Sequence, residues 1–302
     1  PGFFDLASIT VAANFLAASL GTTVAFAEFN SLLYASFGKV LAKQNAGGTA
    51  FTGVQVFPAV ITDLEPFTDN YLYIAQGLAA SYWYMDTNEI ATIASAIVSV
   101  NTFQFFKTVH AAAPTLWGNT TAYQIRSNAT PQANTWSGTT TVGSSYYAIT
   151  ALITKSGALY IMKEDMPYYL NSAGAVQNDL APELQACTAS TSGKNAKVWR
   201  NKIYIPAGTQ ALLETDGTTN TFINPGDYAV NSAAYVGQVQ ALAYDEAFLF
   251  AAIDYSTKVE ILTGREETID GATAWHWHAI NELTLAGAEC MFVSSIYQKR
   301  LW

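Results

Sequence analysis

The stretch RNKIYIPAG, residues 200–208, places an apolar-aromatic-apolar triplet directly after a polar turn, and KSGALYIMK, residues 155–163, is a near copy of it. The same pattern recurs along the whole chain. Its copies are Leu33-Tyr34-Ala35, Leu72-Tyr73-Ile74, Leu116-Trp117-Gly118, Leu159-Tyr160-Ile161, Ile203-Tyr204-Ile205, Leu249-Phe250-Ala251 and Leu301-Trp302. Successive copies begin 39 to 52 residues apart. A near-constant period of this length is typical of propellers and other repeat arrays.

Short apolar runs surround each triplet and indicate β-strands. One run precedes the triplet, as in Val239–Tyr244, and another follows it, as in Tyr168-Tyr169-Leu170. A fourth, more polar run is clearest at 274–278. Runs rich in β-branched and aromatic residues, separated by Gly, Asn, Asp and Ser, are typical of strands joined by hairpins. A helical repeat would need apolar residues three and four positions apart over about a dozen residues, and the chain lacks that spacing.

These repeats predict an all-β fold: a β-propeller of about seven four-stranded antiparallel blades, with six blades as the alternative. We expect residues 1–302 to form a single propeller domain with repeats of about 44 residues. The strands at 158–162, 202–206 and 248–252 should occupy equivalent positions in successive blades.

The triplets should form inner strands that are buried on both faces. Successive residues of a strand point to opposite faces, so a continuous apolar triplet predicts apolar contacts on each side. A blade that packs between two neighbouring blades provides those contacts. We therefore expect Tyr160 and Tyr204 to be buried between blades.

The ends of the chain should complete one blade. The seventh triplet, Leu301-Trp302, lacks the outer strands, and an open blade would expose unpaired backbone groups. We expect residues 3–17 to pair with the strands around 289–302, and 22–26 to form the strand before Leu33. The alternative is that the chain continues past Trp302. Because the chain starts with Pro rather than Met, we expect it to be processed or to be an excerpt of a longer chain.

The N-terminal segment resembles a membrane span only in part. Residues 6–27 carry no charge and are long enough to cross a bilayer. However, no basic residue precedes them, so the secretory pattern is incomplete. Thr, Ser, Asn and Gly interrupt the stretch, and Ile9-Thr10-Val11 favours a strand. We therefore expect strands here and no membrane span.

Charged side chains are scarce, which limits the partners that the chain can bind. Asp, Glu, Lys and Arg make up 12% of the residues and the net charge is −9, whereas about 25% is usual. Nucleic-acid affinity depends on Lys and Arg that neutralise phosphates, and no cluster of them occurs. We expect no nucleic-acid partner. A neutral polar surface of this kind is common in secreted and particle-borne β proteins.

The cysteines and histidines offer weak candidates for covalent or metal sites. Cys187 and Cys290 lie in different repeats without CxxC spacing, which favours free thiols; a disulfide remains the alternative if they meet in space. His276 and His278 would share one face of a strand, half of a zinc site, but His110 lies several repeats away. We expect an outer strand with aromatic residues on one face and polar tips on the other, and no metal ligands.

Three acidic pairs are the candidates for catalysis: Glu164-Asp165, Asp245-Glu246 and Glu266-Glu267. Glycosidases need two carboxylates facing a sugar. Two of these pairs fall at turns or strand ends, where carboxylates are solvated or cap a turn. No GxSxG, HExxH, phosphate-loop or EF-hand motif is present, and no sialidase-type box recurs. We therefore expect no catalytic residues, no cofactor and no enzyme activity.

Several segments between about residue 70 and residue 302 carry a family resemblance. They are GNTTAYQIRSN, TWSGTTTVGSSYYAITALITKSGALYIMKEDMPYYL, GKNAKVWRNKIYIPAGTQALLETDG, VQALAYDEAFLFAAI, VEILTGREE and WHWHAI. Together they resemble propeller-type virion structural proteins of tailed bacteriophages. The resemblance implies a role in a phage particle, in the tail or its host-facing parts, without transferred catalytic residues.

We therefore expect a virion structural protein that acts as a rigid docking or adhesion module and is located in the extracellular particle. The expected partners are other virion proteins, present in multiple copies within a symmetric assembly, and a host-surface glycan or protein. The alternative is a secreted propeller that binds or cleaves glycans.

Overall fold

The computed structural model describes residues 25–45, 51–94, 102–133, 135–208, 211–225, 237–255, 258–283, 296–297 and 300–301. The chain divides into two compact units, Pro1–Val142 with Tyr297–Trp302, and Gly143–Ile296. Two short 3-10 helices, η3 (Pro131–Ala133) and η4 (Pro182–Cys187), lie among the described residues.

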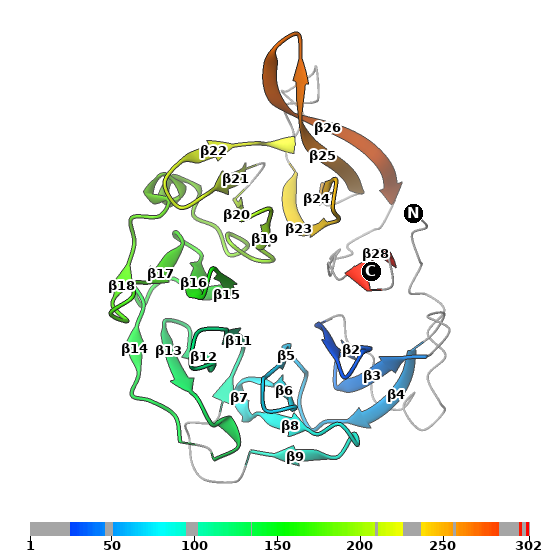
Figure 1. The fold of residues 1–302 in the computed structure, drawn as a ribbon, viewed down its shortest axis with the longest axis vertical. Coiled ribbons are helices and arrows are strands. Elements are labelled where there is room, and N and C mark those ends of the chain that lie inside the picture. The colour runs from blue at the N-terminus through cyan, green and yellow to red at the C-terminus, as the bar shows by residue number, and fades with distance from the viewer. Residues whose placement is uncertain are drawn as a thin grey trace. The chain divides into compact units, whose positions relative to one another are not determined.

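Three four-stranded antiparallel sheets build most of the first unit (Figure 1). The first contains β1 (Phe26–Phe29), β2 (Leu32–Phe37), β3 (Val40–Gln44) and β4 (Phe51–Val56). The second contains β5 (Asp63–Pro66), β6 (Leu72–Ala75), β8 (Trp83–Met85) and β9 (Ala91–Ile93). The third contains β11 (Phe106–Val109), β12 (Thr115–Thr121), β13 (Gln124–Asn128) and β14 (Thr140–Thr141). In addition, β7 (Gly77–Ser81) pairs with β10 (Thr102–Phe103).

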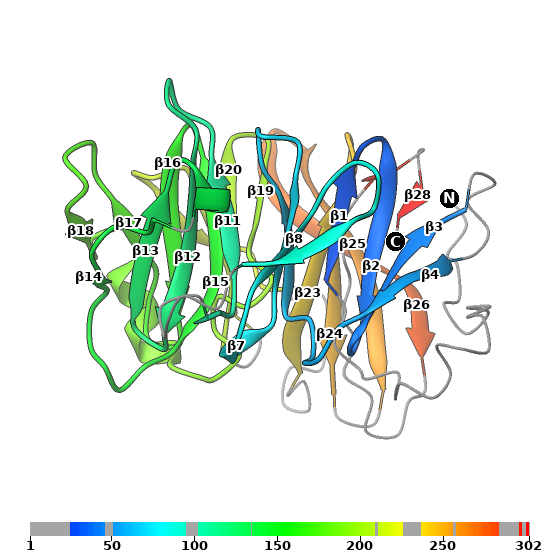
Figure 2. The ribbon, with the colours of Figure 1, turned by 90° about the horizontal axis from the view of Figure 1, so that it is seen from below.

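Three further sheets of the same kind build the second unit, and their strands follow one another in chain order (Figure 1; side view in Figure 2). The first contains β15 (Ile149–Lys155), β16 (Ala158–Lys163), β17 (Tyr168–Leu170) and β18 (Val176–Gln177). The second contains β19 (Lys197–Trp199), β20 (Lys202–Ala207), β21 (Ala211–Thr215) and β22 (Asn220–Phe222). The third contains β23 (Gln238–Tyr244), β24 (Leu249–Asp254), β25 (Val259–Ile269) and β26 (Ala272–Leu283). Near the C-terminus, β27 (Ile296–Tyr297) and β28 (Arg300–Leu301) form a two-stranded sheet.

Every triplet copy lies in a strand. Six copies lie in the second strand of a four-stranded sheet, namely β2, β6, β12, β16, β20 and β24, and Leu301 of the seventh copy lies in β28. The predicted strands at 158–162, 202–206 and 248–252 correspond to β16, β20 and β24. Both the all-β fold and the equivalence of the repeats are therefore confirmed.

Tight turns set the register of the first hairpin in three of the sheets. Asn30-Ser31, Ser156-Gly157 and Arg200-Asn201 each form a two-residue turn with positive φ at both positions, between 49° and 77°. This geometry matches the twist of the flanking strands. In the third case it pairs Trp199 with Lys202, so Tyr204 lies two residues further along on the same face as Lys202.

In four of the six second strands, β2, β6, β20 and β24, every residue of the triplet is buried, as predicted, whereas the central Trp117 of β12 is half-buried. Leu33 and Ile203, which begin two of the triplets, are fully buried, and the central residues Tyr34 and Tyr204 are each 1% exposed. The prediction for Tyr160 is wrong, because its side chain is only half-buried. The difference lies in what covers each ring.

Tyr204 has aromatic neighbours on two sheets, whereas Tyr160 has one on its own sheet. The ring centroid of Tyr204 lies 5.8 Å from that of Trp199 and 5.9 Å from that of Trp275, which belongs to the next sheet. The ring of Tyr160 lies 5.8 Å from Tyr169 in its own sheet. A second aromatic cover therefore completes the burial of Tyr204.

Hydrogen bonds one repeat apart join neighbouring sheets within each unit. In the first unit, Thr62 Oγ1 donates to Gln104 O, 42 residues away. In the second unit, the donors are Thr150, Asn195, Trp199 and Arg200, and their acceptors are the backbone oxygens of Ser192, Gln240, Asp245 and Glu246, 42 to 46 residues away. The sequence period is therefore also the spacing at which one sheet is bonded to the next.

Two carboxyl side chains of β5 form further junctions of this kind in the first unit. Asp63 Oδ2 accepts a hydrogen bond from Phe106 N at 2.8 Å, and Glu65 Oε1 accepts one from Thr108 N at 2.7 Å. Glu65 also pairs with Lys107 at 2.7 Å. Burial, reinforced by the charge of Glu65, raises the pKa of Asp63 to about 7.

The predicted closure of a blade through the N-terminus concerns residues 3–17 and lies outside the described residues. The strand predicted at 22–26 lies partly outside them. The strand that pairs with β2 is β1, which runs from Phe26 to Phe29. Within the described residues, no helix is both long enough and apolar enough to cross a membrane.

Replacing Tyr204 by Ala should lower the free energy of unfolding by about 3–5 kcal/mol, the range for deleting a large buried aromatic ring. The matched change Tyr160→Ala should cost clearly less, because half-buried Tyr160 leaves a smaller cavity. Urea unfolding of the two variants and the parent measures both values. Equal losses would contradict the role assigned to the second aromatic cover.

The junction at Asp63 should make stability depend on pH. Its pKa of about 7 in the folded protein exceeds the value of about 3.9 in an unfolded chain. The stability contributed by the protonated carboxyl is therefore present below about pH 4 and lost as the pH rises through 7. Asp63→Asn, which keeps an oxygen acceptor for Phe106, should flatten this part of the profile. The free energy of unfolding of parent and variant is measured from pH 4 to 8. If it changes with pH in the same way for both, the raised pKa of Asp63 is not the cause of the pH dependence.

Candidate functional site

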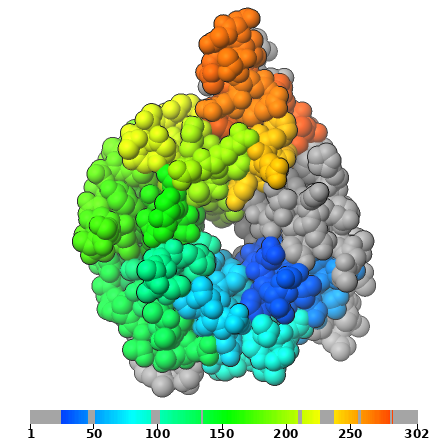
Figure 3. Space-filling model, viewed as in Figure 1, coloured from blue at the N-terminus to red at the C-terminus, as the bar shows by residue number. Residues whose placement is uncertain are grey.

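The β25–β26 hairpin is the longest in the described part of the chain. Its strands contain 11 and 12 residues, whereas the other described strands contain two to seven. Asp270 and Gly271 form its turn with φ values of 53° and 83°, a type I′ turn of the kind that Asp-Gly favours. The distal part forms a two-stranded ribbon that extends clear of the other strands of the second unit (Figure 1, Figure 3).

Two tryptophans anchor the base of this hairpin on the neighbouring sheet. Trp277 is 3% exposed, and its Nε1 donates to Ile223 O at 2.9 Å. Trp275 stacks on Trp277 with centroids 5.6 Å apart. Gly264, the cross-strand partner of Trp277, makes this packing possible, because a Cβ there would lie 2.5 Å from the ring.

The tip of the hairpin, residues 268–274, lies beyond these anchors. All seven residues are exposed. Two of them, Thr268 and Thr273, share a hydroxyl–hydroxyl hydrogen bond of 2.8 Å across the strands, and Ile269 is 50% exposed. A two-stranded ribbon without a third strand or a covering layer is marginally stable in water. The tip therefore depends on the anchored base for its order.

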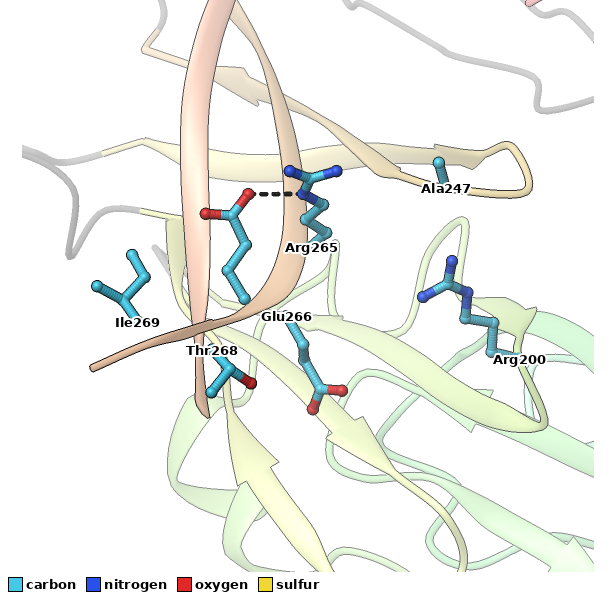
Figure 4. A pocket seen from close by; sticks show the side chains of 7 residues that line it. Arg200, Ala247, Arg265, Glu266, Thr268 and Ile269 are labelled. Atoms are coloured by element: carbon cyan, nitrogen blue, oxygen red, sulfur yellow. Dashed lines mark hydrogen bonds and ion pairs between the residues drawn. The ribbon is translucent and has the colours of Figure 1, made fainter. Parts of the chain in front are cut away.

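A polar hollow lies at the foot of the ribbon (Figure 4). It is open to solvent and has a volume of about 550 Å³. Arg200 reaches it from the β19–β20 turn, Ala247 from the β23–β24 turn, and the remaining lining residues come from β25. These are Arg265, Glu266, Glu267, Thr268 and Ile269.

Both arginines of the hollow are held against aromatic rings. The Arg200 guanidinium lies 4.3 Å from the ring centroid of Trp199, and its Nη2 donates to Glu246 O at 2.5 Å. The Arg265 guanidinium lies 4.9 Å from the ring centroid of Phe248. At exposed sites a cation–π contact of this kind contributes about 0.5–1 kcal/mol, so the rings favour these positions of the two guanidinium groups.

The two carboxylates of the hollow belong to ion pairs. Glu267 Oε1 accepts a hydrogen bond from Arg265 Nε at 2.6 Å, which lowers the pKa of Glu267. Glu266 lies 3.5 Å from Lys202, which also pairs with Glu214 at 2.5 Å. Burial lowers the pKa of Lys202, but the hydrogen bonds and charges of the two glutamates outweigh it, so the pKa is raised.

The other two predicted acidic pairs make local hydrogen bonds, most of them to backbone N–H groups. Glu164 Oε2 accepts from Ala148 N at 2.9 Å, and Asp165 Oδ2 accepts from the Tyr168 hydroxyl at 2.9 Å. The β23–β24 turn is capped by Asp245, whose Oδ1 accepts from the backbone N–H groups of Ala247 and Phe248. The pair Glu266-Glu267 lies within β25 and is the only one of the three pairs that lines the hollow in the described part of the chain.

The histidine strand has the predicted arrangement. Trp275 and Trp277 pack on the neighbouring sheet, and His276 and His278 alternate with them along β26. Among the described residues, no three His, Cys, Asp or Glu side chains gather as a metal site. Cys187 is half-buried and carries no disulfide in the described part of the chain, whereas Cys290 lies outside it.

Sequence reasoning did not identify the arginines of the hollow. Arg200 and Arg265 lie in different repeats, and each looks like an ordinary polar residue beside a strand. One signal was available: Trp199-Arg200 and Asp245-Glu246 precede equivalent triplets by the same small interval. Equivalent turns of neighbouring repeats lie close together, which brings Arg200 to Glu246.

Lys202→Met should lower the free energy of unfolding by about 2–3 kcal/mol, because it leaves the buried carboxylate of Glu214 without its cationic partner. The Glu214 side chain is 8% exposed. Lys258→Met is the matched control. Its partners Glu260 and Glu282 are 15% and 53% exposed, so the loss should be about 1 kcal/mol or less. Denaturant unfolding measures both, and a larger loss for Lys258→Met would contradict this ranking.

Comparison with solved structures supports the fold. A virginiamycin B lyase from Staphylococcus aureus matches with a TM-score of 0.60 at 9% identity, over 84% of this chain and 84% of that chain. A chain of the mitotic checkpoint complex matches with a TM-score of 0.58 at 11% identity, over 87% and 77%. The computationally designed Ika8 protein matches with a TM-score of 0.51 at 8% identity, over 91% of each chain.

At these identities the likeness extends to the fold alone. No protein-family model matches the chain, and no curated protein sequence matches it. The chain therefore has an all-β, β-propeller fold of about seven repeats, six of which form four-stranded antiparallel sheets within the described residues.

Proposed function

We propose that this protein is a non-catalytic docking module that engages another protein through the β25–β26 hairpin. The observation that carries the proposal is the ribbon beyond Trp275, which projects without a third strand. Such a ribbon is marginal alone, and a partner that covers it or pairs with its edge would supply the missing contacts. The exposed Ile269 at its tip offers apolar area to that partner.

The base of the hairpin suits a docking role because it is rigid. Trp275 and Trp277 fix it on the neighbouring sheet, and that sheet is also bonded to the hairpin's own sheet through Trp199 and Arg200. A contact element that is already ordered loses less entropy on binding. The module thus presents its tip in a defined direction.

The environments of the acidic residues support a non-catalytic role. Asp245 caps a turn, Glu267 is held by Arg265, and Glu266 lies next to Lys202. A glycosidase acid needs a raised pKa and a partner carboxylate across the sugar. The pKa of Glu267 is instead lowered.

The setting that we propose is the particle of a tailed phage, in the tail or its host-facing parts. The segments that resemble propeller-type virion proteins include both strands of the hairpin, VEILTGREE and WHWHAI. The low share of charged residues, 12%, is in keeping with a particle-borne protein. The proposed partners are other virion proteins, in multiple copies, and a component of the host surface.

A secreted propeller that binds or cleaves glycans is the second candidate. The polar hollow favours it, because arginine and carboxylate side chains line an open space of about 550 Å³. Release of sugars from a polysaccharide panel, lost in Glu267→Gln, would support cleavage and reject the non-catalytic proposal.

Shortening the hairpin tests the docking role. Deleting Thr268, Ile269, Ala272 and Thr273 keeps the Asp270-Gly271 turn and removes two cross-strand pairs. The variant should have the same melting temperature as the parent, because the deleted residues are exposed. It should bind its particle partner at least about tenfold more weakly. Lys194→Gln, a change in the turn that precedes β19, is the control and should bind normally. Unchanged binding of the shortened chain would reject the hairpin as the docking element.

The phage setting has its own test. Mass spectrometry of purified particles should find the chain in copy numbers that match a symmetric tail component, and antibodies to the recombinant protein should label one part of the particle. A chain that is absent from washed particles would reject the virion role.

A further inference from the structure

The positive charge of Arg200 is not balanced by a carboxylate in the described part of the chain. Its hydrogen bond goes to the backbone oxygen of Glu246, and the ion pairs of the hollow join other cations to the acids. Arg265 uses Nε for its hydrogen bond to Glu267, and no ion pair in the described part of the chain involves its two terminal nitrogens. The hollow thus presents two guanidinium groups with donors to spare.

Both guanidinium groups are positioned before any ligand arrives. Trp199 supports Arg200 and Phe248 supports Arg265 at 4.3 and 4.9 Å. A planar guanidinium binds a carboxylate through two parallel hydrogen bonds, which a lysine cannot reproduce. Because stacking on the aromatic ring already limits the rotamers of each arginine, less side-chain entropy is lost when a ligand binds. These are the properties of a carboxylate-binding pair.

The same hollow also offers acceptors. The Glu266 and Glu267 side chains are 47% and 25% exposed, and Thr268 contributes a hydroxyl to the lining. Carboxylate oxygens accept hydrogen bonds from ligand hydroxyl groups. A ligand that fits the lining therefore carries one carboxylate together with several hydroxyl groups.

We infer that the hollow at the foot of the β25–β26 ribbon binds an acidic sugar, with Arg200 and Arg265 holding its carboxylate and Glu266 and Glu267 accepting from its hydroxyls. A uronic acid has this combination of groups. The volume of about 550 Å³ accommodates a short oligosaccharide, since ligand sites of about 300–1,000 Å³ are usual.

A peptide carboxylate fits the lining less well. Only Ala247 and Ile269 among the lining residues are apolar, so a peptide side chain would bury little apolar area there. A densely charged anion such as a polyphosphate would meet the two glutamates, which repel it. A single carboxylate among hydroxyls meets attraction at the arginines and acceptors at the glutamates.

This inference deepens the host-facing part of the proposed function and rests on it only for the source of the sugar. Sugar binding is measured on the purified chain, whereas docking is measured on the hairpin variant with its particle partner. Loss of one therefore leaves the other standing, and the two failures are distinguishable.

Calorimetric titration of the full chain tests the site with three probes of similar length: trigalacturonate, maltotriose and a triglutamate peptide. Trigalacturonate should bind, and the neutral sugar and the peptide should bind at least about tenfold more weakly. Arg200→Gln and Arg265→Gln should each weaken trigalacturonate binding by about tenfold or more. Arg200→Lys should weaken it similarly, because it keeps the charge but loses the planar fork.

Lys194→Gln is the matched control, since it removes one positive charge and does not line the hollow; it should bind trigalacturonate like the parent. Thermal melts check that each arginine variant is folded, and Arg265→Gln gives an independent reading if Arg200→Gln is destabilised through Trp199. Absence of trigalacturonate binding up to about 10 mM, equal binding of the triglutamate peptide or maltotriose, or parent-like binding by both folded glutamine variants would overturn the inference.

Discussion

Contact between neighbouring sheets is the constraint on which the rest of the structure depends. A single four-stranded sheet of this size has two apolar faces and cannot bury either by itself. Each second strand places Leu, Ile or Ala on one face and an aromatic ring on the other, and at Tyr204 that ring is covered by a tryptophan of the next sheet. Polar groups at the strand ends then fix the neighbour in register, at a spacing of one repeat.

The polar junctions are more specific than the apolar ones. An aromatic ring tolerates small shifts, but the carboxylate of Asp63 must meet the N–H of Phe106, and Glu65 must meet that of Thr108. A buried carboxylate without its partner is costly. We therefore interpret the apolar faces as the main source of stability and these hydrogen bonds as the device that selects one packing arrangement.

The fold was predictable from the sequence because each repeat contains the same short local pattern of residues. Polar turn, triplet and following run recur with nearly constant spacing, so the position of β16, β20 and β24 follows from periodicity alone. The burial of an individual aromatic ring cannot be predicted from the periodicity. Tyr160 and Tyr204 occupy equivalent positions, yet of these two only Tyr204 is fully buried. Its ring is covered by Trp275, which lies 71 residues later in the sequence. A single repeat does not contain that information.

The candidate site was less predictable for the same reason. Glu266 and Glu267 stood out as an acidic pair, but their meaning depends on Arg265, which faces Glu267 on the same strand, and on Arg200, which reaches the hollow from another repeat. The length of β26 could not be predicted either, since the run Trp275–His278 indicates only a short outer strand. Stacking on Trp199 and Phe248 appears only when the turns of adjacent repeats are placed together.

The spacing of the inter-sheet hydrogen bonds also has an evolutionary consequence. Each junction joins two groups that lie one repeat apart, so a duplicated repeat brings a donor for the repeat after it and an acceptor for the repeat before it. Arrays with nearest-neighbour contacts of this kind grow or shrink by whole units without a new type of interface. Divergence can then concentrate in a single copy. The β25–β26 hairpin, elongated in one repeat while the others keep short outer strands, is what such freedom would produce: a new appendage on an inherited scaffold.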